Sequence, residues 1–90
     1  MRVDLGIFEG DNLLFQGGIA ITDKEYKEEN EIVTLKHQLV NDEAVIELRI
    51  FNEGEQILKS KLNMPIHESE DWESIELDKF TLAFKCKLNA

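Results

Sequence analysis

Apolar side chains recur at every second position along most of the chain, and this period constrains the fold more than any other feature of the sequence. Val3, Leu5 and Ile7 alternate with Asp4 and Gly6, which is the spacing of a half-buried β-strand and not of an amphipathic helix. The same alternation returns in four later segments, residues 33–39, 46–50, 58–64 and 80–88. The sequence therefore predicts an all-β fold.

Short polar turns separate these segments, so consecutive strands are expected to pair antiparallel. Six to seven strands can be counted in this way. A single open sheet would leave its apolar face bare, whereas two packed sheets or a closed small barrel would bury it. We therefore predict a small antiparallel β-sandwich, or a partly open barrel, in which residues 1–90 form a single globular β domain, as suits a chain of 90 residues.

One hairpin can be predicted down to its register. Residues 52–54, Asn-Glu-Gly, suit a three-residue loop with the glycine in the left-handed conformation. This loop places Leu48 opposite Leu58 on the core face and Glu47 opposite Lys59 on the solvent face. Both pairs are favourable cross-strand neighbours, which supports this register.

The second strand is predicted to place Leu13, Phe15, Ile19 and Ile21 on one face. Two consecutive glycines, Gly17-Gly18, interrupt this pattern. Paired glycines in a strand predict a bulge or a sharp bend.

Two other places break the alternation. The polar stretch near residues 23–29 follows Thr22, which has capping-box spacing to Glu25, and this favours a solvated loop or one short helical turn. The phase of the apolar positions changes at Asp78-Lys79, which requires a bulge, a bend or a turn. The apolar run after this change is predicted to be a central strand.

The charge is negative and unevenly distributed. The chain has 19 acidic residues against 10 lysines and arginines, a net charge of −9. Clustered cations are absent from the sequence, so direct binding to nucleic acid or to an anionic membrane is disfavoured. The N-terminus has the pattern of a strand and not of a secretory leader, and no apolar run is long enough to span a bilayer. The expected location is the cytoplasm.

Catalytic chemistry finds little support in the sequence. Cys86 is the single cysteine, and its place in the alternation predicts a small buried hydrophobe. Ser60, Ser69 and Ser74 lie in no nucleophile-elbow context, and no glycine cluster has phosphate-loop spacing. The protein is therefore predicted not to be an enzyme and to need no cofactor.

A metal site is also not predicted. His67, Glu68, Glu70 and Asp71 could offer nitrogen and oxygen ligands within one connection, but their spacing matches no EF-hand. The second histidine, His37, lies at an apolar position of an alternating segment. It is expected to be a core or edge histidine.

The stretch PIHESEDWES, residues 65–74, holds the only proline and the only tryptophan of the chain. In one interpretation Trp72 turns inward and plugs the end of the core. In the other it is a contact residue, because tryptophan is enriched in binding hot spots and carboxylates steer a basic partner. The candidate partner-binding set is Glu68, Glu70, Asp71, Trp72, Glu73 and Glu76.

These features favour a non-enzymatic protein-binding module whose acidic surface recognises a basic protein, as inhibitors, antidotes and nucleic-acid mimics do. A structural β-sandwich subunit of a phage or secretion assembly, forming homo-oligomers through exposed strand edges, is the first alternative. A sandwich that binds a small ligand or a carbohydrate is the second. That alternative has thin support, since the chain has one Trp and one Tyr.

Overall fold

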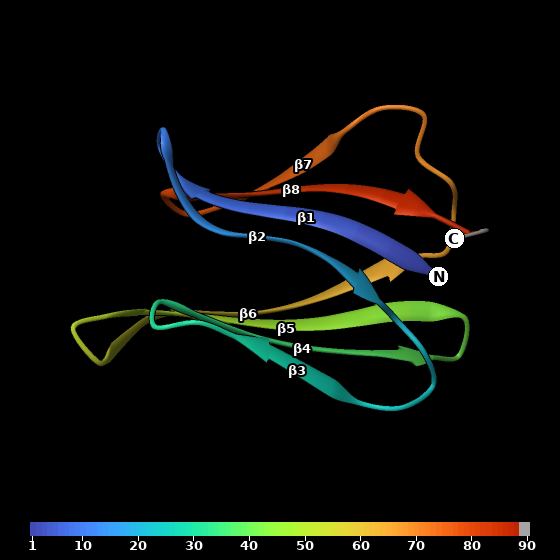
Figure 1. The fold of residues 1–90 in the computed structure, drawn as a ribbon, viewed down its shortest axis with the longest axis horizontal. Coiled ribbons are helices and arrows are strands. Elements are labelled where there is room, and N and C mark those ends of the chain that lie inside the picture. The colour runs from blue at the N-terminus through green and yellow to red at the C-terminus, as the bar shows by residue number, and fades with distance from the viewer. Residues whose placement is uncertain (89–90) are drawn as a thin grey trace. The chain divides into compact units, whose positions relative to one another are not determined.

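The structure, a computed structural model, describes residues 1–88 and is all-β. Eight strands form two antiparallel four-stranded sheets, called sheet A and sheet B below (Figure 1). The all-β class predicted from the alternation is confirmed, with eight strands in place of six to seven, and within residues 1–88 no strand belongs to both sheets. This is the strand content of a small β-sandwich. The strands are β1 (Arg2–Glu9), β2 (Asn12–Ala20), β3 (Tyr26–Glu29), β4 (Val33–Val40), β5 (Glu43–Asn52), β6 (Glu55–Pro65), β7 (Glu73–Leu77) and β8 (Phe80–Lys87).

The chain divides into two compact units, and each contains one sheet. The first unit comprises residues 1–20 together with the chain from residue 67 onward, and it contains sheet A. The second unit comprises residues 21–66 and contains sheet B. The single domain spanning residues 1–90 stays a prediction.

Sheet A has the strand order β2-β1-β8-β7, so β8 pairs on both sides, as predicted for the last apolar run. One face of the sheet is buried, because the apolar positions of β1 and β8 lie in register. The prediction that Cys86 is a small buried hydrophobe is confirmed. The two strands contribute seven buried side chains: Val3, Leu5, Ile7, Phe80, Leu82, Phe84 and Cys86.

A one-residue bulge in the β1–β2 hairpin turns one leucine outward. Ile7 pairs with Phe15, but the next pair is Phe8 with Leu13, so the register shifts by one residue at Leu14. An offset of one residue moves the following side chains to the other face of a strand. Leu13 is consequently 49% exposed, and the prediction that it shares the core face with Phe15 is wrong.

The two glycines of β2 lie in an unbroken ladder. Gly17 pairs with Leu5 and Gly18 with Asp4, so the bulge predicted at this place is absent. The glycines make room for neighbouring side chains instead. A Cβ atom on Gly18 would lie 2.5 Å from Nη2 of Arg2 and 2.9 Å from Oδ1 of Asp4.

Sheet B has the strand order β3-β4-β5-β6, and β3 lies where the sequence predicts a loop or a helical turn. Tyr26–Glu29 pairs antiparallel with β4, with Glu28 opposite Leu35. The helical turn predicted near residues 23–29 is therefore wrong, and none of residues 1–88 is helical. The strand is short and mostly polar, so its conformation depends on backbone pairing with β4 and not on its own propensity.

The buried face of sheet B contains a histidine. His37 is 2% exposed, as predicted for a core or edge position, and its ring centroid lies 6.2 Å from that of Tyr26. Its Nε2 atom lies 3.5 Å from Oε1 of Glu28, but within the described residues neither ring nitrogen makes a hydrogen bond. The other buried side chains of this face are apolar: Val33, Leu35, Ala44, Ile46, Leu48, Ile50 and Met64.

The β5–β6 hairpin turns at two residues, Glu53-Gly54, whose φ angles of 51° and 80° are both positive, as a type I′ turn requires. A bulge then leaves Ile57 without an opposite residue. Leu48 consequently faces Ser60, two residues beyond the predicted Leu58, and the predicted register is wrong. The predicted faces are preserved, because an offset of two residues keeps each side chain on its side of the sheet.

Three further hairpins also close with two-residue turns, and the one between β1 and β2 turns at Gly10-Asp11, with a φ angle of 57° at Gly10. Asn41-Asp42, with φ angles of 51° and 63°, joins β4 to β5. Asp78-Lys79 joins β7 to β8, with a φ angle of 59° at Asp78. The phase change predicted at residues 78–79 is therefore a turn within sheet A.

The strained turn residue at position 53 offers a test of the β5–β6 hairpin. We expect Glu53→Asn to raise the free energy of unfolding by about 0.5–1 kcal/mol, because asparagine tolerates the left-handed conformation better than glutamate does. Urea denaturation measures the change. Glu55→Asn, in the first position of β6, is the control and should bring no gain. An unchanged or lowered stability of Glu53→Asn would contradict the assigned turn.

Candidate functional site

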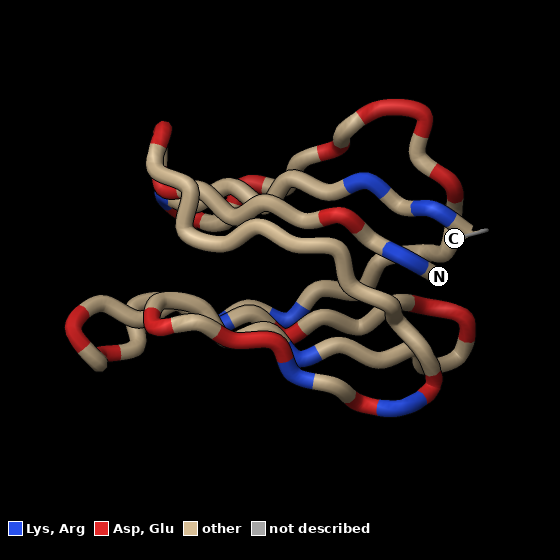
Figure 2. Tube along the Cα trace, in the orientation of Figure 1, with Lys and Arg blue, Asp and Glu red and all other residues tan. Residues whose placement is uncertain are grey.

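The predicted acidic connection joins β6 to β7 and is exposed. Figure 2 shows acidic positions concentrated in this connection. Three of its carboxylates, Glu68, Glu70 and Asp71, are exposed and form no ion pair within residues 1–88. All six residues of the candidate set have exposed side chains, but the structure gives them different surroundings.

Ser69 fastens this connection to the end of β8. Its backbone N–H donates to the carbonyl of Cys86 at 3.0 Å, and its Oγ accepts a hydrogen bond from the Cys86 N–H at 3.1 Å. The Ser69 hydroxyl also donates to Oε2 of Glu73 at 2.6 Å. Ser69 is only 8% exposed. These bonds hold the chain between β6 and β7 against sheet A, immediately before Trp72.

Glu73 takes part in the same group of bonds, and this group of His67, Ser69 and Glu73 is called the Glu73 tether below. It lies opposite Phe84, so it occupies the same side of β7 as Ile75 and Leu77, which face the buried side of sheet A. Its Oε2 atom accepts the Ser69 hydroxyl and lies 2.8 Å from Nε2 of His67. The hydrogen bond from Ser69, and then that from His67, lowers the pKa of Glu73 below its ordinary value. The Glu73 carboxylate therefore already has two hydrogen-bond partners inside the protein.

The Ser69 hydroxyl donates to Oε2 of Glu73, and Nε2 of His67 lies against the same oxygen. Burial raises the pKa of the neighbouring Cys86 thiol, which keeps it protonated. These groups therefore hold a loop in place.

Within residues 1–88, no three His, Cys, Asp or Glu side chains converge closely enough to hold a metal ion. The same residues form no helix with the length and hydrophobicity of a membrane span.

Trp72 faces solvent. Its side chain is 56% exposed, so the interpretation in which it plugs the end of the core is wrong. It borders a hollow of about 180 Å³ whose floor contains Gly6 and Ala83, and whose sides include Phe8 and Leu13. These apolar groups and the indole form a shallow surface depression on sheet A.

Strand register shows which residues share this surface. Leu13, Phe8, Thr81 and Glu76 lie side by side in one row across four strands. Glu76 is held by a 3.1 Å hydrogen bond that its Oε2 atom accepts from the Thr81 hydroxyl. The Trp72 face is defined here as the solvent-exposed side of sheet A that carries Phe8, Leu13, Trp72 and Glu76.

Small residues keep the Trp72 face hollow. A Cβ atom on Gly6 would lie 2.9 Å from Cε2 of Phe8, so the ring leans over the glycine. Trp72 also lines a second hollow of about 250 Å³, together with Asp4, Gly17 and Gly18. Trp72 therefore borders two depressions.

Sequence reasoning found part of this surface. The predicted partner-binding set includes Trp72 and Glu76, which lie on this surface, and Glu73, which faces the other side of β7. It missed Phe8 and Leu13, since only the bulge of β2 brings them together on the solvent side. The signal available in the sequence was the change of apolar phase within the segment LLF at residues 13–15.

A group of cations gathers on the solvent side of sheet B. Lys36 and Lys61 lie on either side of Glu47, which is opposite Lys61 and not the predicted Lys59. Arg49 lies opposite Lys59, and it donates to Oε1 of Glu47 from Nε at 3.1 Å and from Nη2 at 2.8 Å. The cationic group is defined as Lys36, Arg49, Lys59 and Lys61. The sequence conceals it, because these residues come from three strands.

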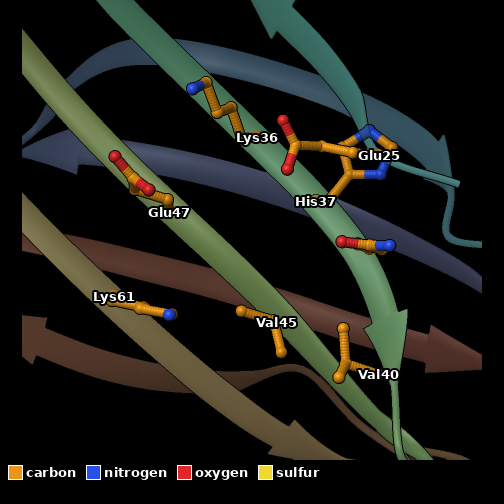
Figure 3. A pocket seen from close by; sticks show the side chains of 8 residues that line it. Glu25, Lys36, His37, Val40, Val45, Glu47 and Lys61 are labelled. Carbon is orange, nitrogen blue, oxygen red and sulfur yellow. The ribbon is translucent and has the colours of Figure 1, made fainter. Parts of the chain in front are cut away.

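A hollow of about 230 Å³ adjoins the cationic group (Figure 3). Lys36, Glu47 and Lys61 project from three neighbouring strands at one side of it, and Val40 and Val45 line another part. The bond from Arg49, followed by the charges of Arg49, Lys59 and Lys36, lowers the pKa of Glu47 below its ordinary value. Glu47 is thus an ionised carboxylate surrounded by the side chains of the cationic group.

Comparisons with protein-family models, with curated proteins and with solved structures gave no match to this chain.

The Glu73 tether predicts a pH dependence of stability. A carboxyl group whose pKa is lowered by folding stabilises the folded state above its unfolded pKa, here near 4.5, and this stabilisation is lost as the pH falls through the folded value. We expect the melting temperature of the protein to fall below about pH 4.5 more steeply than that of Glu73→Gln. Thermal melts between neutral and acid pH measure this.

Glu76→Gln is the matched control, because Glu76 has no cationic partner within residues 1–88. It should keep the steep decrease in melting temperature at acid pH that the unmodified protein shows. An equally steep decrease for the unmodified protein and for Glu73→Gln would contradict the tether.

Proposed function

We propose that the protein is a non-enzymatic binding module that recognises a basic protein partner through its Trp72 face. The observation that carries the proposal is the 56% exposure of Trp72 beside an apolar hollow and next to unpaired carboxylates. Exposed tryptophan in such a setting is the typical anchor of a protein interface. Glu73 is left out of the contact set, because its carboxylate already bonds Ser69 and His67 and it lies on the other side of β7.

A lysine or arginine of the partner fits this surface in two parts. Its aliphatic stem can lie in the hollow against the indole of Trp72 and the ring of Phe8, where the cation gains from the face of an aromatic ring. Its charged head can reach Glu76 or the carboxylates of Glu70 and Asp71. The carboxylates also steer a basic partner during encounter.

The partner class follows from the charge. A surface in which carboxylates surround a tryptophan suits a basic groove, such as the groove of a nucleic-acid-handling protein, where carboxylates would stand in for phosphates. An inhibitor or antidote role is therefore the favoured form of the proposal. The choice of a nucleic-acid-handling protein as partner is an analogy based on charge.

A small-ligand role has weaker support. Sites for small organic ligands are typically about 300–1,000 Å³ and enclose most of the ligand, whereas the hollow beside Trp72 measures about 180 Å³. It suits one side chain of a larger partner. The structural-subunit alternative predicts a defined oligomer in solution, and light scattering after size-exclusion chromatography separates it from a monomeric binding module.

The single tryptophan allows a direct test with a basic probe. We expect hexa-arginine to cause a saturable change in Trp72 emission at low salt, and we expect the affinity to fall as salt screens the carboxylates. The triple variant Glu68→Lys, Glu70→Lys and Asp71→Lys should weaken this binding by about tenfold or more. Fluorescence titration measures both effects.

A matched triple variant controls for net charge. Glu43, Glu53 and Glu55 are exposed residues of the second unit, which does not contain Trp72, and their replacement by lysine makes the same change in net charge. This variant should retain the response to hexa-arginine. Equal weakening by the two triple variants would show that only overall charge matters and would reject the Trp72 face as the site.

A further inference from the structure

The last strand of sheet B has a free edge. β6 is an edge strand in the order β3-β4-β5-β6, and within residues 1–88 it pairs only with β5. It is the longest strand of the chain, with 11 residues. One side of its backbone is therefore available for pairing, and exposed edges of this kind accept an added strand.

The solvent side of this edge is positively charged. Lys59 and Lys61 alternate along β6 and form no ion pair within residues 1–88. Arg49, the residue opposite Lys59, is already bound to Glu47. Like charges at directly opposite positions are unfavourable in a sheet, so Arg49 and Lys59 leave positive charge that an external carboxylate would neutralise.

The other side of this edge is apolar and incompletely covered. Leu58, Ser60 and Leu62 face the same side of sheet B as the buried Ile50 and Leu48, but they are only half-buried. An additional strand beside β6 would cover them. The free edge thus presents lysines on one face and leucines on the other, with a period of two residues.

We propose that β6 binds an extended acidic segment of a partner protein as an additional strand of sheet B. Acidic side chains of that segment lie beside Lys59 and Lys61, and its apolar side chains lie beside Leu58 and Leu62. The side-chain spacing of the partner segment matches that of β6, because residues two apart in any strand are separated by about 6.6–6.8 Å. The required partner sequence alternates acidic and apolar residues.

The charges select this occupant over others. Lysines on an edge strand discourage pairing with a second copy of the same edge, since lysine would meet lysine. The net charge of −9 repels nucleic acid, and a phosphate backbone would satisfy neither the free peptide groups nor the leucines. An acidic strand with apolar residues at alternate positions would pair with the free peptide groups of β6, neutralise its lysines and cover its leucines. This site is separate from the Trp72 face and does not depend on the function proposed for it.

Fluorescence anisotropy with a labelled peptide of alternating glutamate and valine tests the proposal. We expect this peptide to bind the full chain and a peptide of alternating lysine and valine not to bind. The double variant Lys59→Glu and Lys61→Glu should lose about tenfold or more in affinity for the acidic peptide and gain affinity for the basic one. The matched variant Lys24→Glu and Lys79→Glu, changed in exposed turns, should bind the acidic peptide as the unmodified protein does.

A third peptide separates strand addition from simple charge attraction. The glutamate–valine peptide with its alternate backbone amides N-methylated keeps the charges but cannot complete a ladder. Loss of binding by this peptide supports the proposal. Equal binding of the methylated peptide, equal affinity of the two double variants, or no binding of the acidic peptide would each overturn it.

Discussion

The pleat of the β-strand is the constraint on which the rest of this structure depends. Successive side chains point to opposite faces, so a chain with apolar residues at alternate positions must bury one face of each sheet and expose the other. Single-residue bulges then decide where the alternation is reset. The bulge at Leu14 exposes Leu13, and the one at Ile57 shifts the β5–β6 register by a residue. The Trp72 face exists because the first of these bulges brings Leu13 beside Phe8.

Both sheets protect one edge strand with an inward-facing glutamate close to a histidine. In β3, Glu28 lies on the side of the buried Leu35 and approaches His37. In β7, Glu73 lies on the side of the buried Phe84 and contacts His67. Inward-pointing charges of this kind discourage a further strand from pairing at an edge. β6 has lysines on its solvent side instead, which leaves its edge open to an acidic strand.

The sequence was sufficient for the class of fold and for most of the core, because burial follows directly from the alternation. It was insufficient for β3, whose four mostly polar residues carry no apolar period, and for the β5–β6 register, which depends on a tight turn and a bulge. Of the candidate site, Trp72 and its acidic neighbours were found because they are contiguous. Phe8 and Gly6 come from β1 and Ala83 from β8, and only the ladder of sheet A unites them with Trp72. The cationic group was hidden for the same reason.

The proposed interface depends on Trp72 lying on the solvent side of sheet A, beside Gly6 and Ala83, where a partner can reach it. A nuclear Overhauser spectrum of the labelled protein measures this placement, since the ring protons of the only tryptophan are readily assigned. We expect cross-peaks from the indole to Gly6 and to the methyl group of Ala83. Cross-peaks from the indole to the buried side chains of Ile7 or Leu82 would contradict it, and the interface proposed for this face would then be lost.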